Sequence, residues 1–541
     1  MMPSVEQAPS PDVRRQLEEA AREYRAGRFE EAVRQLRTLH RRVPDWLPAE
    51  ELLGLSLVAT GNPGEAEPLL RDVLVRNPGS ERARFGLGVV ACEQHHWNPA
   101  LAHFEAVLRS SPDHPEAHFN RARCLEELGH TAQALQAYQR CLTLDPRHLE
   151  AAAHYAALLE ETNQPDAARP WVEQVLARHP KHVLARFVAA QLAARSGNPQ
   201  RALDLLEGLD PADLSPADRA VRAGRRVRAL DALDRPAEAL QAAREGHWHL
   251  EGLEGQMGPE GLYGTPSIRL LRDHPDALTA LQSWSAHRAD AGERLIFLVG
   301  FPRSGTTLLD RMLSAHPALR VLEETNPLAP VLAQAMTGLM DPAHRPGTDA
   351  LQEPLDRAET VFRAAGLGDS GWVVDKLPLN SPFSAWLHFL FPRARFLVAI
   401  RDPRDVCLSC YLQVFSPNPA MRHFQTLHGA AEYYDLVMGI FETQRQKILP
   451  PDRVRIQVYE RLVDDPAGEL RALCGFLGLE FDPAMVHPHR RLAGIRIGTP
   501  SYDQVSQPVH GDRVGRWRAY APALRPLAPL LDPWVRHWGY E

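Results

Sequence analysis

The sequence predicts a multidomain protein, with an all-α array of helical pairs followed by an α/β domain that has a central parallel sheet. A 34-residue period in the first half indicates the array. In the second half, short apolar runs suited to buried strands alternate with helical patterns, which favours a parallel sheet covered by helices on both faces. A chain of 541 residues is long enough for two domains or more. We expect these domains at residues 13–250 and 290–541.

The period is carried by prolines and by small residues. Proline recurs every 34 residues, at Pro44, Pro78, Pro112, Pro146 and Pro180. Alanine keeps the same interval at Ala32, Ala66, Ala100, Ala134, Ala168 and Ala202, and Ala or Gly stands twelve residues before each. Small residues allow two helices to pack closely, and proline ends the second helix of a pair. The pattern resembles the tetratricopeptide repeat over about residues 13–214, with an irregular seventh pair ending near Gly246.

The resemblance to this repeat implies a superhelix with an extended concave face. We interpret that face as a docking surface for a protein or peptide; the alternative is a structural scaffold that supports homo-oligomers. A Gly- and Pro-rich segment, residues 252–267, marks the expected boundary with the second domain.

The most informative segment of the second half is Arg294–Leu309, an apolar strand followed by a glycine-containing loop and a helix. Glycines bracket the loop, and hydroxyl side chains stand at the helix N-terminus, where free N–H groups favour an anion. A nucleotide-triphosphate loop would have lysine at the position of Thr306. Here the cation is Arg303, inside the loop, which favours an anion smaller than a triphosphate.

A second signature covers residues 395–415. A buried strand ends at Arg401, and the helix that follows carries Ser409 two turns later. An arginine fork and a hydroxyl at this spacing can bind one phosphate. The alternative is that Arg401 interacts with the helix dipole or pairs with Asp402.

Together these motifs resemble the sulfotransferases, which bind 3′-phosphoadenosine-5′-phosphosulfate (PAPS). The loop PRSGTTLL is similar to their 5′-phosphosulfate loop, and the Arg401–Ser409 spacing to their 3′-phosphate element. Over about residues 294–520 the chain resembles the tyrosylprotein sulfotransferases. Glu324 lies twenty-one residues after Arg303, where that family has its general base, and Lys376 matches the catalytic lysine.

The same resemblance implies the remaining site residues. Ser501 matches a serine near the sulfate, Tyr459 an adenosine contact, and Arg516 replaces a lysine that contacts the nucleotide. The implied catalytic residues are Glu324, Arg303, Lys376 and Ser501. The implied donor-binding residues are Arg303, Ser304, Gly305, Thr306, Thr307, Arg401, Ser409, Tyr459 and Arg516. PAPS is the implied co-substrate, and no metal is implied.

We therefore expect a PAPS-dependent sulfotransferase acting on a hydroxyl of a protein or peptide docked by the repeats, with tyrosine as the candidate acceptor. A carbohydrate or small-molecule acceptor is the alternative within this class. A repeat adaptor with an inactive nucleotide-binding domain is the alternative outside it. The missing loop lysine disfavours an ATP-dependent kinase.

Composition restricts the expected partners and location. The net charge of −7 gives no indication of a nucleic-acid partner. No uninterrupted apolar run approaches the ~18 residues of a membrane-spanning helix, and the N-terminus lacks an apolar signal core. Six cysteines do not suggest a disulfide framework. These features lead us to expect a cytoplasmic protein without a membrane partner, although the eukaryotic family members are membrane-anchored and contain disulfides.

Overall fold

The structure is a computed structural model that describes residues 10–251, 261–274, 288–340, 348–368, 371–415, 418, 420–488 and 509–541. The chain divides into two compact units, residues 1–188 and 189–541. The first unit is entirely helical, and the second contains the sheet.

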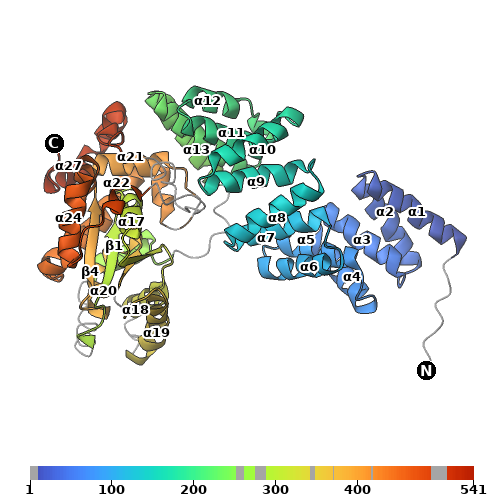
Figure 1. The fold of residues 1–541 in the computed structure, drawn as a ribbon, viewed down its shortest axis with the longest axis horizontal. Coiled ribbons are helices and arrows are strands. Elements are labelled where there is room, and N and C mark those ends of the chain that lie inside the picture. The colour runs from blue at the N-terminus through green and yellow to red at the C-terminus, as the bar shows by residue number, and fades with distance from the viewer. Residues whose placement is uncertain are drawn as a thin grey trace. The chain divides into compact units, whose positions relative to one another are not determined.

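The first unit is built from consecutive helical pairs, which follow one another from α1 to α9 in Figure 1. Their bounds are α1 Pro11–Arg25, α2 Phe29–Arg42, α3 Leu47–Ala59, α4 Pro63–Arg76, α5 Glu81–Glu93, α6 Trp97–Ser110, α7 Pro115–Glu127, α8 Thr131–Leu144, α9 Leu149–Glu161 and α10 Pro165–Arg178. The second helix of each pair ends two residues before a periodic proline. The predicted array of repeated helical pairs is thus confirmed.

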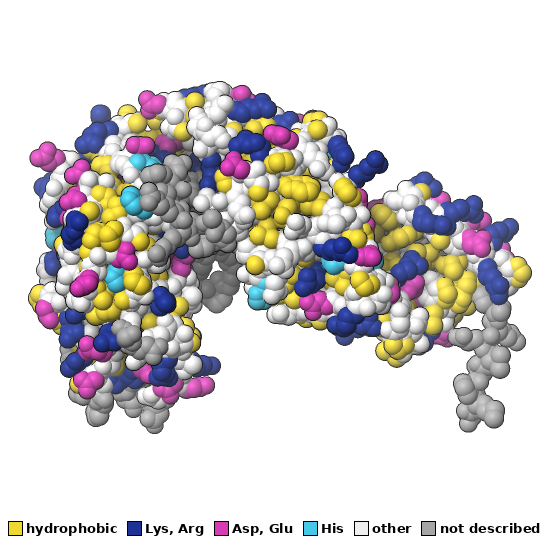
Figure 2. All heavy atoms as spheres, in the orientation of Figure 1, with side chains coloured by type: hydrophobic (Ala, Val, Ile, Leu, Met, Phe, Trp, Pro, Cys, Tyr) yellow, Lys and Arg dark blue, Asp and Glu magenta, His cyan; other side chains and the backbone are white. Residues whose placement is uncertain are grey.

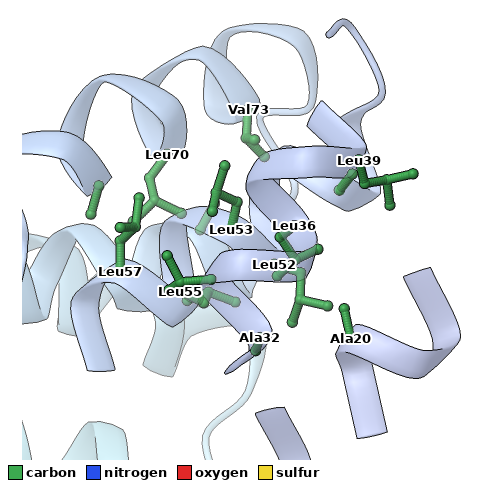
Figure 3. Packing of buried hydrophobic residues seen from close by; sticks show 14 of the residues in the cluster. Ala20, Ala32, Leu36, Leu39, Leu52, Leu53, Leu55, Leu57, Leu70 and Val73 are labelled. Atoms are coloured by element: carbon green, nitrogen blue, oxygen red, sulfur yellow. The ribbon is translucent and has the colours of Figure 1, made fainter. Parts of the chain in front are cut away.

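The small residues of the repeat lie where two helices approach most closely. Ala20, Ala32 and Ala66 have no exposed surface, and Figure 3 shows Ala20 and Ala32 beside the leucines of the surrounding helices. A Cβ added at Gly88 would lie 2.7 Å from Cε1 of Phe104, a ring that is itself fully buried. The repeat therefore keeps Gly or Ala at these positions because the facing side chain occupies the space of anything larger.

The second unit begins within α11 (Val183–Arg195) and continues with four further helices, α12 Pro199–Glu207, α13 Pro216–Ala232, α14 Pro236–Glu251 and α15 Thr265–Asp273. The helices α13 and α14 are the predicted seventh pair. The second of them is longer than expected, since it extends past Gly246 to Glu251.

Five parallel strands form one sheet in the order β2-β3-β1-β4-β5. Their bounds are β1 Leu295–Gly300, β2 Leu319–Glu323, β3 Trp372–Lys376, β4 Arg395–Ile400 and β5 Val454–Val458. Every residue of the central strand β1 is buried, as expected for a parallel sheet covered on both faces. This sheet confirms the predicted α/β domain.

The strands are connected and covered by helices (Figure 1). Those described are α17 Thr306–Ser314, α18 Ala329–Met340, α19 Thr348–Ala364, α20 Ser384–Leu390, α21 Pro403–Leu412, α22 Leu427–Lys447, α23 Tyr459–Asp464, α24 Pro466–Leu477, α26 Ala521–Leu524 and α27 Ala528–His537.

One element differs from the sequence-based expectation. Residues 319–323 form the edge strand β2, where the sequence indicated no strand, and α18 begins only at Ala329. Glu324 and Asn326 adopt positive φ angles of 51° and 48°, which a right-handed helix does not allow. In the edge strand β2, Leu319 is buried and Arg320 is exposed. Five residues are too few for a clear alternation of apolar and polar side chains in the sequence.

The surface carries charges of both signs. Figure 2 shows Lys and Arg side chains interspersed with Asp and Glu on the visible face, in keeping with the modest net charge of −7. In the part of the chain that the structure describes, none of the helices combines the length and the apolar character needed to span a membrane.

Substitution of Gly88 by alanine should destabilise the array, because the added methyl group would overlap the ring of Phe104. We expect a loss of about 1–3 kcal/mol, typical of overpacking, measured as a lower midpoint of thermal unfolding. Gly64→Ala is the matched control: that glycine lies in α4 with nothing within 4 Å of an added Cβ. Equal midpoints for the two variants would contradict the packing argument.

Candidate functional site

The candidate site lies at the carboxyl end of the central strand β1. β3 pairs with one side of β1 and β4 with the other, so the chain crosses from one half of the sheet to the other at this point. Ligands of open α/β sheets bind at such switch points, beyond the carboxyl ends of the strands. The loop after β1, residues 301–305, therefore occupies the expected position.

The backbone of this loop requires glycine at its last position. Gly305 has φ +98° and is the N-cap of α17. A Cβ there would lie 2.5 Å from Cδ2 of Tyr459, so the loop and that ring are in direct contact. The first turn of α17 carries Thr306 and Thr307, both largely buried, and its N–H groups have no partner within the helix.

Arginines from three separate segments surround the loop. One pocket, called here the loop pocket, is lined by Arg303, Gly305, Thr306, Thr307, Leu308, Arg401, Tyr459, Val509, His510 and Arg513. Nε of Arg303 donates to Oγ of Ser409 at 3.1 Å. The guanidinium of Arg401 lies 4.9 Å from the ring centre of Tyr459.

The charges in the loop pocket are of one sign. Burial, together with the positive charges of Arg401, Arg513 and Arg516, lowers the pKa of Arg303 to about 10. Arg303 nevertheless remains cationic at neutral pH. Several partly buried cations that lie near one another favour the binding of an anion with more than one negative charge.

Among the buried polar atoms at this site that have no hydrogen-bond partner in the described chain, two belong to the loop and to Arg401. They are Oγ of Ser304 in the loop and Nε of Arg401. An unpaired buried donor costs free energy, and such atoms often mark the place of a ligand or water. A bound anion with several oxygen acceptors would satisfy both.

Two aspartates hold the segment that closes the pocket. Asp405, on α21, accepts hydrogen bonds from the backbone N–H groups of Gly515 and Trp517, each at 2.8 Å, and pairs with Arg401 at 3.4 Å. Asp231, on α13, pairs with Arg513 at 3.0 Å and with Arg516. These contacts hold residues 513–517 against α21 and α13.

A second cluster lies at the carboxyl end of β3. Lys376 is fully buried, and its Nζ donates to Oε1 of Glu324 at 2.8 Å. Glu323 and Asp310 lie 3.4 Å and 3.8 Å from the same nitrogen. Burial raises the pKa of Asp310 to about 6. Among these three carboxylates, Glu324 has the most exposed side chain, at 47%.

The structure thus brings most of the implied site residues into two neighbouring clusters. Around the loop pocket lie Arg303, Ser304, Gly305, Thr306, Thr307, Arg401, Ser409 and Tyr459. Lys376, at the end of β3 beside β1, and Glu324, directly after β2, form the second cluster. Arg516 does not line the loop pocket and pairs with Asp231 instead. Ser501 lies outside the described residues.

Three residues at the site were not singled out from the sequence. Arg513 lines the loop pocket, and Asp405 and Asp231 hold its segment. Asp405 had a weak signal, because it stands four residues after Arg401 at helical spacing. Arg513 lies close in sequence to the expected contact Arg516, whereas Asp231 gave no signal.

Comparisons with known proteins agree with this arrangement. Residues 295–483 match the model of the sulfotransferase family. The C-terminal domain belongs to the sulfotransferase family. Residues 51–95, 90–148 and 127–190 match models of the tetratricopeptide repeat, so the N-terminal array is a tetratricopeptide-repeat domain.

Similar proteins carry a more specific name. The protein-tyrosine sulfotransferase 2 of Gallus gallus is 28% identical over 294 residues, which cover 50% of this chain and 76% of that protein. The protein-tyrosine sulfotransferase 1 of Danio rerio is 29% identical over 268 residues, covering 46% and 72%. A solved structure of Pseudomonas aeruginosa pilF is 17% identical, with a TM-score of 0.33, and covers 36% of this chain and 89% of that one.

These relatives correct one expectation. The cytoplasmic location expected from the sequence is wrong, because the protein-tyrosine sulfotransferases that resemble the C-terminal domain are Golgi-resident enzymes. The expectation depended on the absence of an apolar segment and on the few cysteines. Neither feature identifies the compartment in which a protein works.

Asp375, beside Lys376 on β3, should make this sulfotransferase domain less stable as the pH rises. Both of its carboxylate oxygens are buried without a hydrogen-bond partner in the described chain, and burial raises its pKa to about 7. Because the unfolded pKa is about 3.9, its contribution to stability is complete below that value and is lost as pH rises through about 7.

We expect the Asp375→Asn variant to lose less thermal stability than the wild type between pH 4.5 and pH 8. Each kcal/mol of difference corresponds to roughly 2–4 °C in a domain of this size. Thermal midpoints of the two proteins at both pH values provide the measurement. Parallel pH profiles would show that Asp375 does not titrate in this way.

Proposed function

We propose that the C-terminal domain transfers a sulfuryl group from PAPS to a hydroxyl of a protein or peptide, with tyrosine as the acceptor side chain. The observation that carries this proposal is the loop pocket: three arginines, Arg303, Arg401 and Arg513, line a pocket beside a phosphate-type loop that has threonine in place of lysine. Such a pocket suits a donor with separate anionic groups better than a metal-bound triphosphate.

The residues present fit a 3′-phosphorylated sulfonate donor. The loop hydroxyls and the N–H groups at the start of α17 would hold the 5′-phosphosulfate. Arg401 and Ser409 would hold the 3′-phosphate, and Tyr459 the adenosine. The unpaired atoms Ser304 Oγ and Arg401 Nε support this assignment, since both need an acceptor. When bound, PAPS supplies an activated sulfuryl group.

The second cluster would supply the chemistry at the acceptor. Glu324 would accept the proton of the acceptor hydroxyl; a phenol has a pKa of about 10, so a carboxylate base works as the proton leaves in the transition state. Lys376 and Arg303 would neutralise the charge that develops on the transferring group. Ser501 would add a hydrogen bond. The 2.8 Å contact with Lys376 holds the Glu324 carboxylate in one position while leaving it half exposed.

A protein or peptide acceptor is supported by two features. Relatives of the C-terminal domain are named protein-tyrosine sulfotransferases. In this chain the domain follows a tetratricopeptide-repeat domain, and such arrays commonly present extended binding surfaces. The repeats would dock the acceptor chain, and Glu324 would select the hydroxyl that reacts.

The variant Glu324→Gln should keep donor binding and lose turnover by about 10²–10⁴-fold, the usual contribution of a general base. Turnover is measured with PAPS, and donor binding by calorimetry with adenosine 3′,5′-bisphosphate. Glu323→Gln is the control, because its carboxylate also lies near Lys376 but pairs with Arg311. Equal losses in the two variants would remove the assigned role of Glu324.

The variant Arg401→Ala should weaken the binding of adenosine 3′,5′-bisphosphate by about 10–100-fold, since charge-assisted hydrogen bonds contribute about 1.5–3 kcal/mol each. Arg393→Ala serves as the control. Arg393 stands just before β4, at the opposite end of that strand from the loop pocket, and its partly exposed side chain pairs with Glu293. Unchanged affinity in the Arg401 variant would overturn the phosphate assignment.

A further inference from the structure

The helical pair α13–α14 contacts residues 513–520, which follow the loop pocket's lining residue His510, through the carboxylate of Asp231. Asp231 lies one residue before the end of α13, and its side chain is only 8% exposed. It accepts hydrogen bonds from Nη1 of Arg513 at 3.0 Å, from Nε of Arg516 at 2.7 Å and from the hydroxyl of Tyr520 at 2.7 Å. One aspartate of the helical pair thus holds three side chains of the C-terminal segment.

The other helix of the pair, α14, packs against the helix that carries Ser409. Nε2 of His247 is 2.8 Å from the carbonyl oxygen of Tyr411 on α21, and the hydroxyl of Tyr411 donates to the carbonyl of Leu240 at 3.4 Å. A Cβ at Gly246 would lie 2.8 Å from Cγ2 of Val414. The pair α13–α14 therefore touches two separate parts of the site, α21 and residues 513–520.

Arg513 lines the loop pocket and also contacts Arg401, another arginine of the same pocket. Its backbone carbonyl accepts a hydrogen bond from Nη2 of Arg401. Burial lowers the pKa of Arg513, and the charges of Arg516 and Arg401 act in the same direction, whereas Asp231 opposes them. Without Asp231, Arg513 and Arg516 would repel each other in a poorly solvated place.

Asp405 and Asp231 bind different groups of residues 513–517. Asp405 binds backbone N–H groups, so the path of residues 515–517 does not depend on Asp231. Asp231 binds side chains, so its loss should release the guanidinium of Arg513 from its place at the pocket without unfolding the segment.

We propose that Asp231 is a positioning residue for the donor site: from the last helical pair, it orients Arg513 toward the bound donor anion. This inference rests on the proposed function. It implies that the pair α13–α14, although it continues the helical array, is a structural part of the nucleotide site. The donor site and the end of the repeat array are then energetically coupled.

The test uses the full chain with the substitution Asp231→Asn, which keeps the size of the side chain and removes its charge. We expect the Kd for adenosine 3′,5′-bisphosphate and the KM for PAPS to rise about 5–50-fold, because the competent orientation of Arg513 becomes a minor state. kcat should change less than about twofold. Asp231→Glu should restore part of the affinity, and Asp234→Asn, an exposed neutralisation three residues away, should have no effect.

The outcomes separate the two levels of the proposal. If the wild type does not bind adenosine 3′,5′-bisphosphate, the proposed donor is wrong and this inference falls with it. If the wild type binds it and Asp231→Asn binds equally well or more tightly, only the role of Asp231 is overturned. A variant that loses kcat with unchanged KM would likewise contradict positioning, because it would indicate a smaller folded fraction.

Discussion

The mutual repulsion of four guanidinium groups is the constraint around which the C-terminal domain is organised. Arg303, Arg401, Arg513 and Arg516 lie close enough for three of them to lower the pKa of the fourth. Such a cluster is stable only if carboxylates offset part of its charge and an anion can offset the rest. Asp405 and Asp231 provide the first part, and the loop pocket provides room for the second.

The parallel sheet explains why these groups meet although they are distant in sequence. The carboxyl ends of β1, β3 and β4 lie at the same end of the sheet, because the three strands are parallel. The residues that follow these strands therefore come together there. β1 leads into the phosphate-type loop, β4 leads to Arg401, and β3 ends at Lys376. The backbone of Glu324 is held at the same end of the sheet, because its N–H donates a hydrogen bond to the carbonyl of Lys376 at 2.9 Å.

Residues with strong local signals were predictable from the sequence. The helical pairs follow from a period in which Gly or Ala faces a large side chain, as Gly88 faces Phe104. The central strand follows from an uninterrupted apolar run, and the loop from Gly305, whose backbone angle and contact with Tyr459 allow no side chain. The strand before Arg401 was expected for the same reason as the central strand.

Other features depend on contacts that no local pattern records. The edge strand β2 has five residues, of which Leu319 alone is buried, so its sequence shows no clear alternation of apolar and polar residues. Asp231 and Arg513 are separated by 282 positions, and nothing near either residue indicates the other. The packing of α14 on α21 likewise depends on His247 and Tyr411, which lie 164 positions apart. Tertiary packing, rather than local sequence, determines these parts of the site.

We propose that the arginine cluster binds a 3′-phosphorylated sulfonate donor, from which the sulfuryl group is transferred to a protein. Incubation of the purified chain with sulfur-labelled PAPS and a host extract tests this most directly, with separation of labelled protein, glycan and small molecules. We expect label in protein, in an acid-labile linkage to tyrosine. Label transferred from γ-phosphate-labelled ATP, with none from PAPS, would contradict it.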